Sequence, residues 1–395
     1  MMKKFRFGLL VGAVSLGLIT PAYSLTITAT FDTSITSATN AAAIEGAINF
    51  ALKTLQSNIV DNVAVSILFV SDESVGLGQS QTLGEDVDYA AFITALRSHA
   101  ASLTDTNALK RLTNNTQDPV IGKTTIHLTT AQARVLGIDT TPLDPGLYDS
   151  TVSCKMSLMN FNRTSIDPNK YDFIGTVEHE VNEVLGISSG LPSSTNVWPV
   201  DLFRYTTNLA RTFITTGDNA YFSTDGTNLV ARYNMDAGGD LGDWWSVHDT
   251  NRWSPAGIGT KTQVQDAYGN PGVYDDLGVS ELTALDVVGW TLAVAAPVVS
   301  PKITMVRSGT NKFTLSWTNS ASFVLQESTN VSKSWITSAT GTTNPAVIIA
   351  SKTNKFYRLF HAAGSSFAPE AAVTTKVQPS KSITRYSVTR ALHPR

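Results

Sequence analysis

The pentapeptide His179–Glu183, with the sequence His-Glu-Val-Asn-Glu, combines one imidazole with two carboxylates. Residues four apart share one face of a helix, so His179 and Glu183 can reach the same metal ion. Glu180 lies beside that pair, in the position where a zinc hydrolase places its general base. The spacing therefore predicts a metal-dependent hydrolytic site. The alternative is the solvated face of an amphipathic helix that carries a single histidine.

A helix is needed to bring these side chains together, and the surrounding stretch predicts one. Gly186 follows the last periodic residue, at the place where helices commonly end. Apolar residues recur at positions i, i+4, i+7 and i+8, which indicates a helix with one face toward a core: Val177, Val181, Val184 and Leu185.

The chain on either side of this helix predicts a layered α/β structure. Strands are expected at 25–31, 63–70 and 124–129, and helices at 41–55, 89–100 and 130–136. A strand–helix–strand order of this length begins an α/β layer. Residues 187–275 are rich in Gly, Asp, Asn and Ser, so long loops are expected there, before a further helix at 279–290.

Several stretches in order along the chain resemble a family of secreted bacterial metalloproteases related to the zincins, in which a glutamate likewise replaces the second histidine of the zinc helix. Besides YDFIGTVEHEVNEVLG at 171–186, the resemblance rests on TFD at 30–32, TTAQARVLG at 129–137, PVDLFRY at 199–205, AYFSTDG at 220–226, GDW at 242–244 and LTALDVVGW at 282–290. It covers residues 28–292.

This resemblance implies a zincin-like catalytic domain of the α/β (α+β) class, with the active-site helix beside a mixed sheet. It implies a zinc metallopeptidase: a secreted endopeptidase that holds Zn²⁺ and hydrolyses peptide bonds of protein or peptide substrates through a metal-activated water. In zincins an edge strand pairs with the substrate backbone, and the resemblance places residues 150–153 in that strand.

A catalytic zinc needs three protein ligands and one open position, and the helix supplies only two, His179 and Glu183. Related proteases often carry a histidine ten residues after the first one, where this chain has Ser189. We therefore expect His248 as the third ligand, with Asp243 and Asp201 as alternatives. Each also has an ordinary structural interpretation: His248 as a loop surface residue, Asp243 as the cap of a turn, and Asp201 as a helix cap or ion-pair partner.

The ends of the chain predict further segments. Residues 1–24 have the basic start, the apolar run and the small-residue cleavage site of a signal peptide, so the protein is expected to be exported, extracellular or periplasmic. Residues 25–292 form the expected protease domain. Residues 293–301 are a linker with two prolines, and 302–362 resemble a small immunoglobulin- or fibronectin-like β-sandwich. Residues 363–395 are expected to form a flexible basic tail.

Composition narrows the classes of function. Net charge is −3 and charged residues make up 15% of the chain, so nothing favours nucleic acid as a partner. No later apolar run is long enough for a transmembrane segment. The single cysteine, Cys154, excludes an internal disulfide and lies in an alternating, strand-like run. The C-terminal module leaves surface or carbohydrate contact open.

A second class of function remains at this point: a catalytically weak or inactive zincin-like protein that serves as an extracellular binding or surface protein. Glu183 in place of histidine, and the lack of a third histidine at the usual spacing, favour this alternative. Glu180, which a binding protein would not need, favours the protease.

Overall fold

The computed structural model describes most of the chain from residue 25 to residue 293, six strands between 304 and 361, and residues 385–394. The predicted signal peptide 1–24, the linker residues 294–301 and the expected zinc ligand His248 lie outside the described residues. Within the first stretch the gaps are 113–114, 166, 194, 196, 216–219, 237 and 247–261.

The described residues divide into two compact units. One comprises the chain up to Ala293 together with the part that follows residue 370, and the other comprises residues 294–370. The first unit carries the predicted site.

A mixed seven-stranded sheet forms the base of the first unit. Its β1, β2 and β5 run parallel, whereas β3 is antiparallel to β5 on one edge and to β18 on the other. The order across the sheet is β1 (Thr26–Phe31), β2 (Ala64–Ser71), β5 (Ser150–Cys154), β3 (Gly78–Asp88), β18 (Arg385–Pro394) and β11 (Tyr268–Gly269), with β4 (Thr125–Thr129) also paired to β3.

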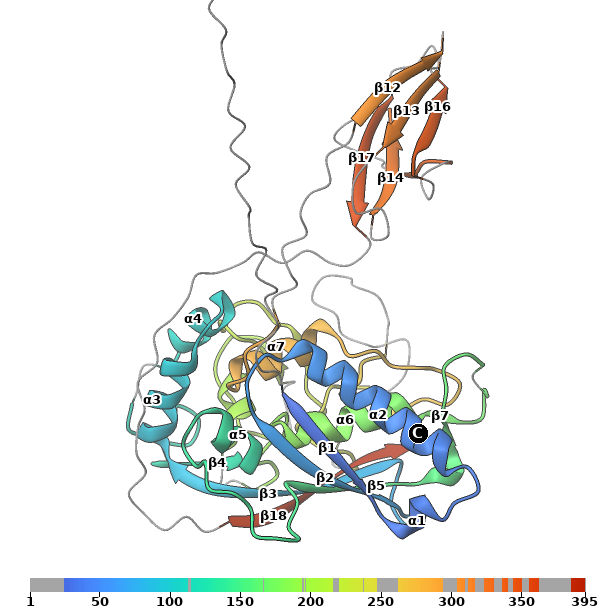
Figure 1. The fold of residues 1–395 in the computed structure, drawn as a ribbon. Helices are drawn as coiled ribbons and strands as arrows, with labels where there is room; N and C mark the ends of the chain where they lie inside the picture. The colour runs from blue at the N-terminus through green and yellow to red at the C-terminus, as the bar shows by residue number, and fades with distance from the viewer. Residues whose placement is uncertain are drawn as a thin grey trace, which may run out of the picture. The chain divides into compact units, whose positions relative to one another are not determined.

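Two long helices, α2 (Ala41–Asn58) and α6 (Phe173–Val184), pack against each other on one face of this sheet (Figure 1). The predicted apolar stripes face the core: Ile44, Ile48 and Leu52 of α2 are buried, as are Val177 and Val181 of α6. Helix α6 also contacts β3 and β18, so its polar residues lie between the sheet and the loops that follow.

Shorter elements complete the first unit. The helices are α1 (Thr33–Thr36), α3 (Tyr89–His99), α4 (Leu103–Leu109), α5 (Thr130–Val135) and α7 (Val279–Val287), with 3₁₀ turns at Met156–Leu158 and Pro199–Phe203. A two-stranded sheet consists of β6 (Met159–Asn160) and β7 (Tyr171–Asp172), and a small three-stranded sheet consists of β8 (Arg204–Tyr205), β9 (Tyr221–Phe222) and β10 (Ala231–Arg232). The strands and helices predicted before residue 187, and the helix beginning at Val279, are confirmed to within a few residues.

The described parts of the second unit consist of strands. They form two three-stranded antiparallel sheets whose apolar side chains share a small core of Leu315, Leu325 and Ala346. The strands are β12 (Thr304–Gly309), β13 (Lys312–Ser316), β14 (Phe323–Ser328), β15 (Ile336–Thr337), β16 (Ala346–Ile349) and β17 (Phe356–His361). An immunoglobulin- or fibronectin-like sandwich over 302–362 stays a prediction.

The expectation that residues 150–153 form an edge strand is wrong. Strand β5 lies inside the sheet, with β2 on one edge and β3 on the other. Strand β3 comes from a polar stretch, Gly78–Asp88, whose Gly, Ser, Gln and Thr residues gave no strand signal, although its inward positions are buried.

The flexible basic tail predicted for 363–395 is also wrong for its last part. Arg385–Pro394 form β18, which pairs with β3 from Gly78 to Glu85. The physical reason is that side chains alternate between the two faces of the strand. Ser387 and Thr389 are exposed, and the alternate residues face the body of the unit: Tyr386, Val388, Arg390 and Leu392. The basic composition hid this alternation, because the arginines meet acidic partners instead of solvent.

Within the part of the chain that the structure describes, no helix combines the length and the apolar character needed to cross a bilayer.

Candidate metal centre

The ends of helix α6 fix its position in the unit. At its start, the Asp172 side chain accepts a hydrogen bond from the backbone N–H of Gly175 (3.1 Å) and forms an ion pair with Arg163 (2.6 Å). At its end, Gly186 has a φ of +111°, and a Cβ there would lie 2.1 Å from Gln132. Two constraints therefore require glycine at this position: the positive φ angle, and the lack of room for a Cβ beside Gln132.

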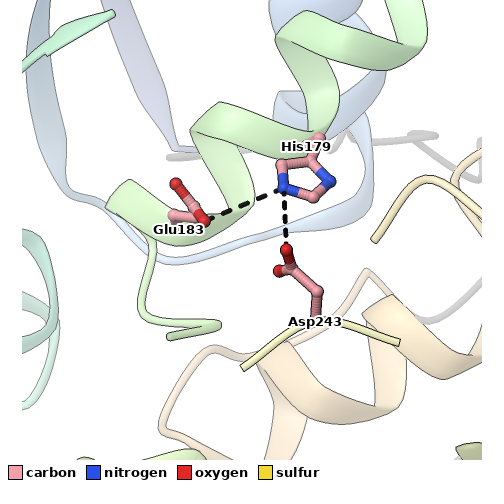
Figure 2. Close-up of side chains that lie close together, drawn as sticks. All are labelled: His179, Glu183 and Asp243. Atoms are coloured by element: carbon pink, nitrogen blue, oxygen red, sulfur yellow. Dashed lines mark ion pairs between the residues drawn. The ribbon is translucent and has the colours of Figure 1, made fainter. Parts of the chain in front are cut away.

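Three side chains converge beside α6: His179 and Glu183 from the helix, and Asp243 from the loop that faces it (Figure 2). His179 Nε2 lies 3.8 Å from Glu183 Oε1 and 3.6 Å from Asp243 Oδ2. All three residues are buried, with at most 1% of their surface exposed.

The imidazole of His179 has a defined orientation. Its Nδ1 lies 2.8 Å from the carbonyl oxygen of Val264, which can only accept, so Nδ1 carries the proton. The lone pair of Nε2 then faces the two carboxylates and the Gln265 amide nitrogen, which lies 3.4 Å away. Burial lowers the pKa of His179 to about 4. A neutral imidazole with a fixed tautomer is the form that binds a metal ion.

Each carboxylate is likewise held by one oxygen and free at the other. Glu183 Oε2 accepts a hydrogen bond from the Ser80 hydroxyl (2.6 Å), and Asp243 Oδ1 accepts one from the Gln265 amide (2.9 Å). The remaining atoms, Glu183 Oε1 and Asp243 Oδ2, are buried without a hydrogen-bond partner, and these are the two that face His179. Such atoms lose their hydration without compensation unless a cation binds them.

The separations fit a divalent ion. Ligand atoms about 2.0–2.2 Å from a tetrahedral metal lie about 3.3–3.6 Å from one another. The 3.6 Å between His179 and Asp243 is at the upper end of that range and the 3.8 Å between His179 and Glu183 is slightly longer, so a small contraction of the side chains would complete the set. His179, Glu183 and Asp243 could therefore hold a metal ion between an imidazole nitrogen and two carboxylate oxygens.

The electrostatics of the group agree with this interpretation. Burial, followed by the nearby Glu180 and Asp243, raises the pKa of Glu183 well above its usual range. Burial, followed by Asp240, raises that of Asp243. Gathering carboxylates away from water is unfavourable while they are charged, and a bound cation reverses that balance.

Glu180 lies next to this group under strand β3. Its two carboxylate oxygens are buried and have no hydrogen-bond partner of normal geometry. A Cβ on Gly78 would lie 2.4 Å from Glu180 Oε1, so the strand can approach the carboxylate this closely only because residue 78 is glycine. Burial raises the pKa of Glu180 to about 8, near the range useful to a group that both accepts and donates protons at neutral pH.

The candidates for the third ligand have different outcomes. Asp243, predicted as an alternative, is the residue that joins His179 and Glu183. His248, predicted first, is among the residues that are not described. Asp201 is not part of the group, because its carboxylate accepts hydrogen bonds from the Ser189 hydroxyl and from the backbone N–H groups of Gly190 and Trp198. It organises the loop after α6.

Sequence reasoning missed the residues that orient the ligands. Ser80, Val264 and Gln265 lie far from α6 along the chain, and none belongs to a motif. A small residue in a strand and an amide in a loop carry no signal of what they will contact. Only the folded chain brings them to the site.

Comparisons with family models, with curated proteins and with solved structures found no match to this chain.

Proposed function

We propose that the protein is a zinc-dependent endopeptidase whose centre comprises His179, Glu183 and Asp243, with Glu180 as the general base. The observation that carries the proposal is the set of three buried donor atoms that face one another, each on a side chain held by a separate hydrogen bond. The unpartnered carboxylate of Glu180 beside them supplies the acid–base group that hydrolysis needs.

Zinc is the proposed ion because one imidazole and two carboxylates belong to its usual ligand types, with a fourth position left for substrate or water. A bound Zn²⁺ would polarise a water molecule and the carbonyl group of the peptide bond. Two carboxylate ligands leave the ion nearly neutral, so we expect a weaker Lewis acid than a site with histidines only, and appreciable affinity for harder ions.

The roles of the chain's own residues follow from their positions. Glu180 accepts a proton from the attacking water and passes it to the leaving amine. Ser80 and Gln265 keep the free oxygens of Glu183 and Asp243 aimed at the centre. The carbonyl of Val264 keeps the Nδ1 proton of His179 in place.

Glu180→Gln tests the mechanism. The variant should retain the metal, because Glu180 is not a ligand, and lose hydrolysis of casein by about 10²–10⁴-fold, because an amide cannot accept the proton. Metal content by mass spectrometry of the purified protein and casein cleavage with and without a chelator are the measurements. Glu45→Gln in α2 is the matched control. A Glu180→Gln variant as active as the parent would refute the mechanism, even with zinc bound.

An extracellular binding or surface protein that has lost catalysis is the second candidate. The complete burial of the centre favours it, because a buried metal can be structural. It predicts bound metal, but no cleavage by the parent and no effect of Glu180→Gln on any substrate.

Export and the role of the second unit belong to the proposal as well. The signal-like residues 1–24 support an extracellular or periplasmic location, where protein or peptide substrates would be met. Surface or carbohydrate contact is proposed for the second unit because its strands resemble a small immunoglobulin- or fibronectin-like module.

A further inference from the structure

The proposed active site is closed in the structure. His179, Glu180, Glu183 and Asp243 expose at most 1% of their surface, so an extended polypeptide cannot reach them. An endopeptidase with this centre needs an element that moves aside. Strand β18 has the position and the contacts of such an element.

Strand β18 fills the free edge of β3 beside Glu180. Leu392 pairs with Gly78, whose backbone touches the Glu180 side chain, and Arg390 pairs with Ser80, which donates a hydrogen bond to Glu183. Paired residues of antiparallel strands point to the same face, so Leu392 and Arg390 point to the face that carries α6 and the centre. An extended peptide added to this edge would make the same main-chain hydrogen bonds.

Two side chains of β18 fit sites that face the centre. Leu392 is buried, and a small cavity beside it is lined by apolar residues such as Leu77 and Val264 and by acidic residues such as Asp172 and Asp266. The burial of Leu392 itself indicates that this position suits an apolar side chain.

Arg390 occupies an acidic site next to the metal group. Its guanidinium donates a hydrogen bond to the Ser189 carbonyl, forms an ion pair with Asp240 (3.4 Å) and lies 5.1 Å above the Trp198 ring. Asp240 and Asp243 also interact electrostatically with each other. Such a site favours a basic side chain over an acidic or neutral one.

The other anchors of β18 are polar and partly exposed. Arg385 pairs with Asp139 and, at 3.4 Å, with Glu85, while the Tyr386 hydroxyl donates to Asp86 (2.6 Å) and its ring packs on His127. Leu392 is the buried apolar side chain of the strand. Leu392 is the one residue of β18 in the buried hydrophobic core, so departure of the strand would remove a single core side chain along with the ion pairs and main-chain hydrogen bonds.

We propose that β18 is an internal ligand that occupies the substrate cleft and blocks the centre. The cleft therefore takes extended peptides of the same kind as β18, with an arginine two residues before a leucine. The inference rests on the proposed function, because β18 blocks a substrate cleft only if the protein is a peptidase. Tethering gives such a strand an effective concentration on the order of 1 mM, enough to exclude most substrates.

Leu392→Asp in the full-length chain is the test, because a buried carboxylate would expel the strand. Thr389→Asp adds the same charge to the exposed face of the same strand and is the matched control. A fluorescent peptide of the sequence RYSVTRALHP should bind Leu392→Asp, measured by anisotropy, and bind the parent and Thr389→Asp at least about tenfold more weakly because the tethered copy competes.

Hydrolysis is read on a quenched peptide that contains Thr-Arg-Ala-Leu. We expect Leu392→Asp to cleave it about tenfold faster than the parent does, again because the tethered competitor is gone. The unlabelled β18 peptide should inhibit that cleavage competitively. The matched substrate with Thr-Glu-Ala-Leu should be cleaved more slowly.

The outcomes separate the two proposals. Peptide binding to Leu392→Asp without hydrolysis by any variant would remove the proposed function and leave the cleft and its ligand standing. A folded Leu392→Asp that neither binds the peptide nor gains activity would overturn the inference, as would equal binding to the parent. If Leu392→Asp does not fold, Arg390→Ala, which leaves the leucine in place, replaces it in the same two measurements, peptide binding and peptide cleavage, with the same expected results.

Discussion

The carboxylate of Asp149 and those of Glu183 and Asp243 are buried to the same degree, yet their surroundings differ. Asp149 meets the Arg134 guanidinium at 2.9 Å, the Thr130 hydroxyl at 2.6 Å and the backbone N–H of Ser66 at 2.8 Å. Glu183 and Asp243 each have one donor and one unpartnered oxygen, and no arginine or lysine contacts either carboxylate among the described residues.

This difference separates a carboxylate that the chain neutralises itself from two carboxylates that could hold a metal ion. At Asp149 the chain itself supplies the cation and the donors, so the group fastens β2, β5 and α5 together. At α6 the chain supplies orientation but no cation in contact with Glu183 or Asp243, which is unfavourable unless a cation from outside completes the site.

Arg134→Met should have the largest effect on stability, because it leaves Asp149 buried without its cation. We expect a loss of about 3 kcal/mol of unfolding free energy, at the low end for breaking a buried pair, since the Arg134 side chain is itself 18% exposed. Urea denaturation with a chelator and with zinc should give the same loss. Lys53→Met, which removes an exposed cation from α2, should change stability by less than about 0.5 kcal/mol. An equally small effect of Arg134→Met would show that the ion pair is not structural.

Glu183→Gln should lower stability only through loss of the metal. In chelator the variant should be as stable as the parent or more so, because it removes a buried, incompletely partnered carboxylate. Zinc at about 100 times its dissociation constant should stabilise the parent by about 2.7 kcal/mol and the variant far less.

The matched control is Asp201→Asn, since Asp201 is buried nearby but bonded within its own loop. It should lower stability in chelator and keep the full gain from zinc. A full zinc gain in Glu183→Gln would remove Glu183 from the ligand set and leave its place to another residue.

The two sides of this comparison were not equally visible in the sequence. His179, Glu180 and Glu183 lie within five residues, and the spacing of Val177 and Val181 predicted the helix that aligns them, so local periodicity was sufficient. Asp243 was predicted only as an alternative, because its approach to α6 depends on the loop path between residues 187 and 246. No periodicity constrains that path.

The fold shows the same limit. Strands with apolar alternation, such as β2, were predicted from their own residues. Strand β3 was missed because its small polar residues become buried only when distant elements such as α6 pack against the strand. Strand β18 was missed because its partner lies some 300 positions earlier in the chain. Long-range pairing decides both, and a single sequence does not display it.

Asp286 provides a third way to neutralise a buried carboxylate. Its Oδ2 accepts a hydrogen bond from the Ser102 hydroxyl (2.8 Å), and Asp105 is nearby. Burial, followed by Asp105, raises the pKa of Asp286 to about 7. A bound proton therefore neutralises Asp286, as Arg134 neutralises Asp149 and as a metal ion is proposed to neutralise Glu183.

The sign of the resulting pH dependence follows from linkage. The folded-state pKa lies above the unfolded value, so this group's contribution is fully present below about pH 4 and is lost as pH rises through about 7. Between pH 5 and pH 6 the unfolded chain has released this proton and the folded chain has not, which lowers the free energy of unfolding by about 1.4 kcal/mol. Asp286→Asn should remove that fall, whereas Asp144→Asn at an exposed position should keep it. Urea titrations at the two pH values measure the difference, and an unchanged fall in Asp286→Asn would mean that Asp286 is already ionised in the folded protein.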